Sequence, residues 1–309
     1  MKKCLIGFLL ILILSTGVSA VTLVPGGQLV GLQLQDGSVT VVGFASAAPE
    51  QAGICKGDRL IAVDGHTIAC AQDVKNALEN AGKTVSVTVL RDVETKKFTL
   101  TPTQNGLGLY LRQGTAGLGT VTYYDPDTSR FGALGHGVND PKGQLLRCCQ
   151  GGVFSAKAVS VKKGQRGKPG QIMGSLQGQD PIGAVEKNVL QGVFGKAQFR
   201  PDEPLPVAEA AQVHAGPATI RATVCEDGLQ EYSVEILKVY PDSRDRTRNL
   251  LLRVTDQALL EKTGGIVQGM SGSPIIQDGK LVGAVTHVLV NDPTTGYGIF
   301  IENMLDAAA

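Results

Sequence analysis

The most informative stretch of the sequence reads GMSGSP from Gly269 to Pro274, and the apolar run LVGAVTH follows from Leu281 to His287. Glycines on both sides of Ser271 allow a tight turn, because a residue without a Cβ tolerates positive φ. Such a turn can direct the backbone amides of Gly269 and Ser271 at one point, where they would stabilise the oxyanion formed in acyl transfer. The stretch therefore predicts a nucleophile loop with Ser271 as the nucleophile.

A serine hydroxyl becomes a good nucleophile only when a neighbouring base takes its proton. The best-placed of the four histidines is His136, which ends an apolar segment (ALGHG, 133–137) among small neighbours that leave the ring accessible. His287 follows Thr286 on the strand after the nucleophile loop and is the second choice, while Thr286 is expected to support the triad or the substrate. His66 follows the Asp64-Gly65 hairpin turn and is expected to be a surface imidazole, and His214 lies in a segment without a motif.

The third member of a triad is a carboxylate that orients the imidazole. Asp140 lies four residues after His136, but Asn139-Asp140-Pro141 is also a strong turn signature. Asp256 precedes Ser271 by fifteen residues and starts a predicted helix, so it could be an N-cap instead. The residues alone leave both carboxylates open.

Composition favours many tight turns between short strands. The 309 residues include 40 glycines and no tryptophan, and the net charge of +1 shows no footprint for nucleic acid. From Gly106 onward, short apolar segments alternate with Gly, Pro and Asp, which predicts antiparallel β-barrels. Strands are expected over 115–124, 153–161, 181–189, 219–224, 232–240 and 250–254, and helices over 256–263 and 301–307.

The N-terminus has the pattern of a signal peptide: Met1-Lys2-Lys3, an apolar run from Leu5 to Leu14, and the small residues Val18-Ser19-Ala20. Export is therefore predicted, with cleavage after Ala20 or retention of residues 1–20 as an anchor. Of six cysteines, one (Cys4) lies in this segment, so five remain, an odd number that argues against a disulfide scaffold. No cofactor or metal is expected; a zinc hydrolase using His136 with Cys148 and Cys149 is the metal alternative.

Residues 25–103 resemble a bacterial PDZ domain. The segment from Lys56 to Gly65 (KGDRLIAVDG) has a tight turn, a strand and an Asp-Gly hairpin turn, and a helix is expected over 72–81. The glycines of Pro25-Gly26-Gly27-Gln28-Leu29 predict a loop whose amides bind a peptide C-terminus, with the next strand accepting the peptide by β-augmentation.

The chain as a whole resembles the SpoIVB family, the PDZ-containing serine peptidases of spore-forming bacteria. The resemblance is carried by PGGQ from Pro25, ALGHG from Ala133, GMSGSPI from Gly269, and YGIFI from Tyr297. It implies a mainly β chain with a PDZ domain at 25–103 and a chymotrypsin-like double β-barrel at 106–309. It also implies that Asp256 is the triad acid, while Asp140 remains the second choice because it lies close to His136 in the sequence.

The same resemblance implies a serine endopeptidase that signals during endospore formation. It would cleave itself and a membrane-bound regulator of an intramembrane protease, in the space between the membranes around the forespore. The competing interpretation is a non-catalytic PDZ scaffold that binds peptides and carries an inactive protease-like barrel. A scaffold would need neither the Ser271 loop nor an accessible His136.

Overall fold

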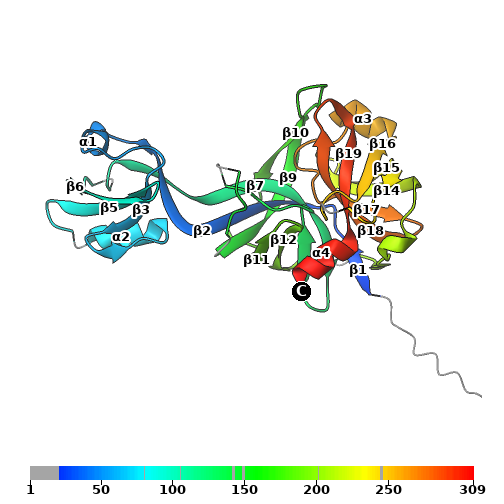
Figure 1. Cartoon of the computed structure of the whole chain (residues 1–309), viewed down its shortest axis with the longest axis horizontal. Helices are drawn as coiled ribbons and strands as arrows, with labels where there is room; N and C mark the ends of the chain where they lie inside the picture. Colours follow the sequence, from blue (N-terminus) through cyan, green and yellow to red (C-terminus); the bar gives the residue numbers. More distant parts are fainter. Residues whose placement is uncertain are drawn as a thin grey trace, which may run out of the picture.

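Two β-barrels and a PDZ domain lie in a row along the molecule, with the PDZ domain at one end (Figure 1). The computed structural model describes residues 21–309 except positions 80, 105, 141–142, 148–149, 201 and 244–245. The predicted signal segment and the pair Cys148 and Cys149 lie outside the described residues. No helix in the described part of the chain is long and apolar enough to cross a bilayer.

The first barrel is a ring of antiparallel strands closed by pairing of β2 with both β7 and β9. Its core contains Val30, Leu32, Val121, Phe131 and Val153. The short β1 and β13 extend the sheet beside β7, and β10 forms a hairpin with β9. The strands are β1 (Thr22–Pro25), β2 (Leu29–Phe44), β7 (Leu109–Asp125), β8 (Arg130–Ala133), β9 (Gln150–Lys162), β10 (Gln171–Leu176), β11 (Gly183–Val189), β12 (Gly192–Ala197) and β13 (Leu205–Pro206).

The second barrel is closed in the order β14-β15-β16-β19-β18-β17. Alternate residues of β16 point inward, so Leu250, Leu252 and Val254 are buried, as the period of a strand requires. The strands are β14 (Gly216–Thr223), β15 (Leu229–Val239), β16 (Leu250–Val254), β17 (Pro274–Gln277), β18 (Lys280–Leu289) and β19 (Asp292–Phe300), preceded by the 3-10 turn η1 (Ala210–Gln212).

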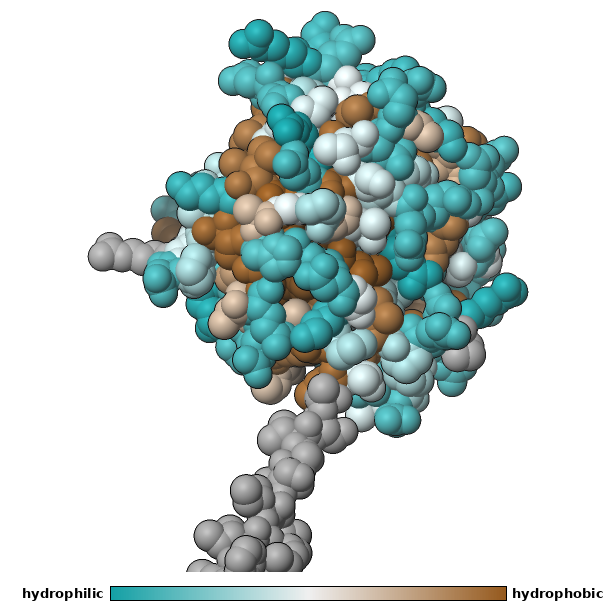
Figure 2. Space-filling view, turned by 90° about the vertical axis from the view of Figure 1, so that its right-hand side faces the viewer, coloured by the Kyte–Doolittle hydropathy of each residue, from teal (hydrophilic) through white to brown (hydrophobic). Residues whose placement is uncertain are grey.

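Two helices accompany the second barrel. Helix α3 (Gln257–Thr263) begins after the N-cap Asp256 and ends at Gly264, whose φ of 73° is the left-handed conformation that favours glycine. Helix α4 (Ile301–Ala308) follows β19 directly and buries Ile301 and Met304 in a cluster that includes residues of both barrels, Phe194 and Leu281. At the end of the molecule formed by the second barrel, hydrophilic side chains surround separate apolar patches (Figure 2).

The PDZ domain is built on the far ends of β2 and β7, which leave the first barrel together (Figure 1). From Val39 onward β2 pairs with β3, and β5 and β6 complete the sheet around a core that includes Val41, Leu60 and Val87. The elements are α1 (Ala47–Gln51), β3 (Arg59–Val63), β4 (His66–Thr67), α2 (Ala71–Glu79), β5 (Val85–Arg91) and β6 (Glu94–Leu100).

The sequence predicts a PDZ domain followed by two barrels, but the first strand of the first barrel precedes the PDZ domain in the chain. Residues Leu29–Leu34 pair with Thr115–Thr120 of β7 and belong to the first barrel, so the PDZ domain is inserted into that barrel rather than placed before it. β2 is thus a single strand shared by both domains, an arrangement that the sequence alone did not predict. The predicted double barrel, its strands and both C-terminal helices are confirmed.

Candidate active site

Ser271 lies in a pocket of about 670 Å³ that is lined by residues of both barrels. Its hydroxyl donates a hydrogen bond to the Thr286 carbonyl oxygen at 2.8 Å, and its side chain is half-buried. Glycines flank it as expected: Gly269 has φ of 101° and Gly272 has φ of 97°. A Cβ at Gly272 would lie 2.1 Å from the Thr120 carbonyl oxygen, so only glycine lets this loop approach the first barrel.

His136 reaches the same pocket from the first barrel, just after β8. Gly135 has φ of 67°, and a Cβ there would lie 2.8 Å from Thr286 Cγ2. The loop can therefore touch β18 only because residue 135 is glycine. This contact explains how a histidine of one barrel and a serine of the other come to line one pocket, as the sequence predicted.

The His136 imidazole is held in the tautomer that a base needs. Its Nδ1 lies 2.9 Å from the Gly137 carbonyl oxygen. A carbonyl can only accept, so Nδ1 carries the hydrogen and Nε2 keeps its lone pair. Burial lowers the pKa of His136, partly opposed by this hydrogen bond, which keeps the ring neutral over a wider pH range.

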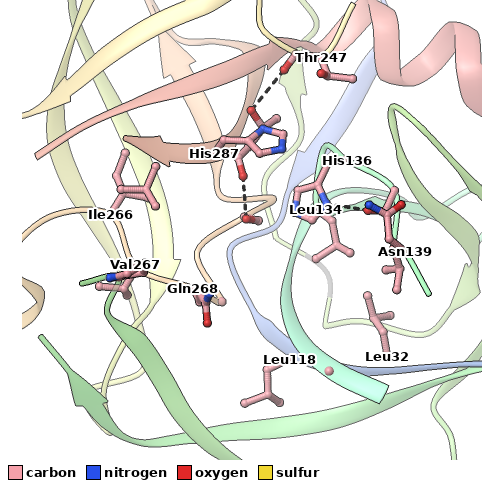
Figure 3. A pocket seen from close by; sticks show the side chains of 18 of the residues that line it. Leu32, Leu118, Leu134, His136, Asn139, Thr247, Ile266, Val267, Gln268 and His287 are labelled. Carbon is pink, nitrogen blue, oxygen red and sulfur yellow. Dashed lines mark hydrogen bonds between the residues drawn. The ribbon is translucent and has the colours of Figure 1, made fainter. Parts of the chain in front are cut away.

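His287, the second-choice base, also lies at the site. The centroid of its ring is 5.2 Å from that of His136, with an angle of 40° between the ring planes, and both rings line the pocket (Figure 3). Thr286 also lines the pocket, and its hydroxyl lies 3.2 Å from each of two carbonyl oxygens that can accept its hydrogen, those of Thr247 and Tyr297. Thr286 therefore serves the site through its own carbonyl, which holds the Ser271 hydroxyl.

The backbone amides of Gly269 and Ser271 remain available to a ligand. Among the described residues, neither amide nitrogen donates a hydrogen bond within the protein, although the neighbouring amides of Met270 and Gly272 do. Both residues line the pocket. Free amide donors beside a serine hydroxyl are what an oxyanion hole requires.

The structure does not bring the predicted acid to the imidazole. Asp256 caps helix α3: its Oδ1 accepts from the Leu259 amide at 2.9 Å and its Oδ2 from the Ser233 amide at 3.3 Å. Asp140 closes a turn by accepting from the Gln144 amide at 2.9 Å. None of the described residues that line the pocket is an aspartate or a glutamate. Asp256 thus acts as an N-cap, and Asp140 accepts a hydrogen bond within a turn.

The remaining histidines lie elsewhere, and no metal cluster forms among the described residues. His66 is exposed in β4, and His214 Nε2 lies 2.9 Å from Asp278 Oδ2 on the surface. In the described ranges, no three His, Cys, Asp or Glu side chains are close enough to hold a metal ion.

The loop predicted to bind a peptide carboxylate is packed between the two barrels. The Gly26 and Gly27 amides donate to the carbonyls of Thr122 and Val121, at 2.9 and 2.7 Å. A Cβ at Gly27 would lie 2.5 Å from Leu229 Cδ1 of the second barrel. Gly26 and Gly27 therefore serve close packing, and their amides are not free to bind the peptide carboxylate expected at Gly26, Gly27, Gln28 and Leu29.

A second glycine loop, Gly106-Leu107-Gly108-Leu109, has the properties expected of a carboxylate-binding loop. Gly106 and Gly108 have φ of 96° and 71°, and in the described residues the Leu107 and Gly108 amides donate no hydrogen bond. The Ala45 amide donates to the Gly108 carbonyl, which turns the Leu109 amide away from β2. The GLGL sequence directly before a strand was the signal that could have found it.

The edge of β7 that follows this loop lies beside helix α2, and this strip between β7 and α2 is hereafter called the groove. Within the described chain, Leu109–Gln113 pairs only with β2, so its other edge is open to another strand. The ends of α2 lie beside this edge: the Ala71 amide donates to Gln113 Oε1 at 3.0 Å, and Leu78 lies 3.9 Å from a Cβ built at Gly106. An open strand edge beside a helix is the geometry of peptide capture by β-augmentation.

Comparison with known proteins identifies both kinds of domain. The model of the SpoIVB peptidase S55 family matches residues 103–305, and the PDZ domain model matches residues 27–101. A comparison with curated proteins gives no match.

Three solved structures are similar in part. The inactive form of the Rv3671c protease is 14% identical over 62% of this chain and 82% of that one, with a TM-score of 0.37. The active form from M. tuberculosis is 16% identical over 63% and 75%, with a TM-score of 0.36. An HtrA-type protease, AlgW with a decapeptide, is 10% identical over 91% of this chain and 62% of its own, with a TM-score of 0.37.

The S55 match covers well over half of the chain and includes His136, Ser271 and most of the residues that line their pocket. The chain therefore belongs to the SpoIVB peptidase S55 family, as a serine peptidase that carries a PDZ domain.

Proposed function

We propose that Ser271 is the nucleophile of this peptidase, that His136 is its general base, and that the amides of Gly269 and Ser271 form the oxyanion hole. The observation that carries the proposal is the shared pocket: two residues from different barrels meet there, beside two free amides. Each group has the chemistry that its role needs, since the hydroxyl has a proton to lose and Nε2 has a lone pair to take it.

In the proposed reaction, the Ser271 hydroxyl turns from the Thr286 carbonyl to His136 Nε2. Its Oγ attacks the scissile carbonyl while Nε2 takes the proton, and the amides of Gly269 and Ser271 bind the resulting oxyanion. The imidazolium gives its proton to the leaving amine as the C–N bond breaks, which leaves an acyl-enzyme. Water, activated by the same Nε2, then releases the acid and restores Ser271.

In this proposal the Gly137 carbonyl orients the His136 imidazole, as the carboxylate of a triad acid would. It accepts from His136 Nδ1 and so fixes the tautomer, although it brings no full negative charge to stabilise the imidazolium. Burial of His136 opposes the charged form as well. We therefore expect a slower enzyme than one with a carboxylate at this position.

The pocket and the groove favour different parts of a protein substrate. Beside Ser271 the pocket is lined by Ile266, Val267 and Val288, so an apolar side chain is expected next to the scissile bond. The groove between β7 and α2 would hold an extended peptide, with its terminal carboxylate on the amides of Leu107, Gly108 and Leu109. Cleavage and capture would thus use separate surfaces.

We further propose the biological role that membership of the SpoIVB family suggests. The protease would be exported, held at the membrane or released into the space around the forespore, and would cleave itself and a membrane-bound regulator of an intramembrane protease. The family match and the PDZ domain support this role. Self-cleavage is its most accessible part, because it needs only the purified chain.

The test compares Ser271→Ala with Ser273→Ala, two hydroxyl deletions in one loop. Ser273 is fully buried, and its hydroxyl has no hydrogen-bond partner in the described structure. Cleavage of β-casein and of the chain itself is followed by gel electrophoresis and mass spectrometry. Ser271→Ala should cleave neither protein while melting like the wild type, and Ser273→Ala should retain cleavage. Cleavage by Ser271→Ala would refute the assignment.

A further inference from the structure

The nucleophile loop belongs to the second barrel, but the first barrel holds three of its carbonyl groups. The Ile172 amide of β10 donates to the Gln268 carbonyl at 2.9 Å. Thr120 of β7 makes the other two contacts: its hydroxyl donates to the Gly269 carbonyl at 2.6 Å, and its amide donates to the Ser271 carbonyl at 3.1 Å. Of these three donors, only the Thr120 hydroxyl belongs to a side chain.

These carbonyl contacts determine where the amides point. A peptide unit is planar, so its C=O and N–H groups point in opposite directions. The bond to Ile172 therefore turns the Gly269 amide to the side opposite β10. The peptide between Gly269 and Met270 links the two oxyanion donors. Its orientation sets the direction of the Ser271 amide relative to the Gly269 amide. Thr120 fixes this peptide through its carbonyl.

The loop needs such a restraint because of its glycine. Gly269 has φ of 101°, and a residue without a Cβ has several other conformations within reach. The contact is well shielded, since Thr120 is only 1% exposed, and no water competes easily for a bond made there. On the other side of the same peptide, the Met270 amide donates to the Val267 carbonyl at 3.1 Å. The peptide is thus held at both ends.

We propose that Thr120 is a positioning residue of the oxyanion hole, which holds the Gly269–Met270 peptide so that the amides of Gly269 and Ser271 converge on the reacting carbonyl. The proposal rests on the assignment of Ser271 as nucleophile. It gives the first barrel a second part in the reaction, in addition to the base His136.

The chain offers a matched control on the same strand. Thr122 lies two residues further along β7, is fully buried, and its hydroxyl has no hydrogen-bond partner in the described part of the chain. Thr120→Val and Thr122→Val both replace a buried hydroxyl by a methyl group of similar size. Only the first removes a contact to the nucleophile loop. Thr120→Ser keeps the hydroxyl and removes the methyl group.

The experiment measures reaction with a fluorophosphonate probe, whose phosphoryl oxygen must enter the oxyanion hole as Ser271 attacks. The maximal rate constant and the half-saturating probe concentration are determined separately for each variant. For Thr120→Val, the maximal rate constant should fall about ten- to a hundredfold, less than the loss of an entire oxyanion donor. The half-saturating concentration and the pH profile should stay unchanged, because probe binding and His136 are untouched.

Thr120→Ser should react within about threefold of the wild type, because its hydroxyl can make the same bond. Thr122→Val should react like the wild type. If Thr120→Val does not give a cooperative melt, Thr120→Ala, which removes the same hydroxyl, is measured in its place.

The proposal is overturned if Thr120→Val reacts at the wild-type rate, or if Thr120→Ser is as slow as Thr120→Val, which would assign the effect to packing of the methyl group. Equal slowing by Thr122→Val would mean that the barrel has loosened generally. A wild-type protein that does not react at Ser271 would refute the proposed function, and this inference with it.

Discussion

In the proposed function, the pocket between the barrels and the groove of the PDZ domain use the same device, a glycine loop that presents backbone amides to oxygen. They differ in what surrounds the loop. Barrel contacts from Thr120 and Ile172 fix the Gly269 loop, whereas the Gly106 loop precedes an open strand edge. A braced loop suits an oxyanion that exists only during the reaction, and an open edge suits a peptide that must enter and leave.

The two sites are nevertheless parts of one strand. β7 begins at Leu109 beside the groove and reaches Thr120 beside Ser271. If the sites are chemically separate, changes in one should leave the reaction of the other intact. The predictions that follow test this separation, beginning with the largest effect.

Replacing the base should abolish catalysis and leave the groove intact. Base and nucleophile act as a unit, so His136→Ala should lower the rate of β-casein cleavage by a factor on the order of a million. A fluorescein-labelled peptide ending in a free valine carboxylate should bind this variant as it binds the wild type, as measured by fluorescence anisotropy. His287→Ala is the control and should retain most of the activity. A ranking in which His287→Ala is the more severe change would move the base to His287.

Damage to the groove should have the converse effect. Gly108→Ala forces a side chain into a position with φ of 71°, where its Cβ would meet Ser46 Oγ at 2.5 Å. Affinity for the valine-ended peptide should fall about tenfold or more, while the fluorophosphonate rate stays unchanged.

Gly65→Ala is the control for backbone strain alone. Gly65 has φ of 81°, so alanine is strained there too, but nothing lies within 4 Å of a built Cβ. This variant should leave peptide affinity at the wild-type value. Equal binding of the free carboxylate and of the same peptide as its C-terminal amide would show that the loop does not recognise a carboxylate.

Asp256→Ala should affect neither site directly. Its carboxylate caps α3, and loss of an N-cap costs about 1 kcal/mol of folding free energy. We expect a lower midpoint of urea unfolding with the fluorophosphonate rate nearly unchanged. If Asp256 were the acid of a triad, its loss would reduce the rate by a factor on the order of ten thousand. A loss of that size would show that the carboxylate reaches His136 during the reaction.

Acid should slow the reaction in the pocket only below about pH 6.5, the ordinary pKa of histidine. Burial lowers the pKa of His136 below its ordinary value of about 6.5, so the base stays neutral and active at pH 6.5 and loses activity only further down. In the unfolded chain the ring gains its proton near pH 6.5. The folded state therefore loses stability as the pH falls from about 6.5 to the lowered pKa. A half-maximal rate at or above pH 7 would contradict this environment for His136.

Most of the fold could be read from the sequence, because the signals were local. Alternation of apolar residues predicted strands such as Leu250–Val254, and the GMSGSP and ALGHG motifs predicted Ser271 and His136. Both motifs carry glycines whose close approach to the other barrel is now visible at Gly135 and Gly272.

The errors arose where one local pattern fits two environments. Gly26-Gly27 and Gly106-Leu107-Gly108 are alike as sequence, but only pairing across the chain shows that the first is packed against Val121 and Leu229. Asp256 likewise fits both an acid and an N-cap, and only its hydrogen bonds to the Leu259 and Ser233 amides show the N-cap. Thr120 carries no motif at all, since its role depends on a contact with residue 269.

The central claim is that acyl transfer takes place at Ser271, and the most direct measurement of it is the site of covalent labelling. The protein is treated with a fluorophosphonate and digested, and the modified residue is identified by tandem mass spectrometry. We predict one phosphonyl group on Ser271, none on the buried Ser273, and loss of β-casein cleavage in proportion to labelling. Labelling at another serine, or fully labelled protein that still cleaves β-casein, would contradict the account.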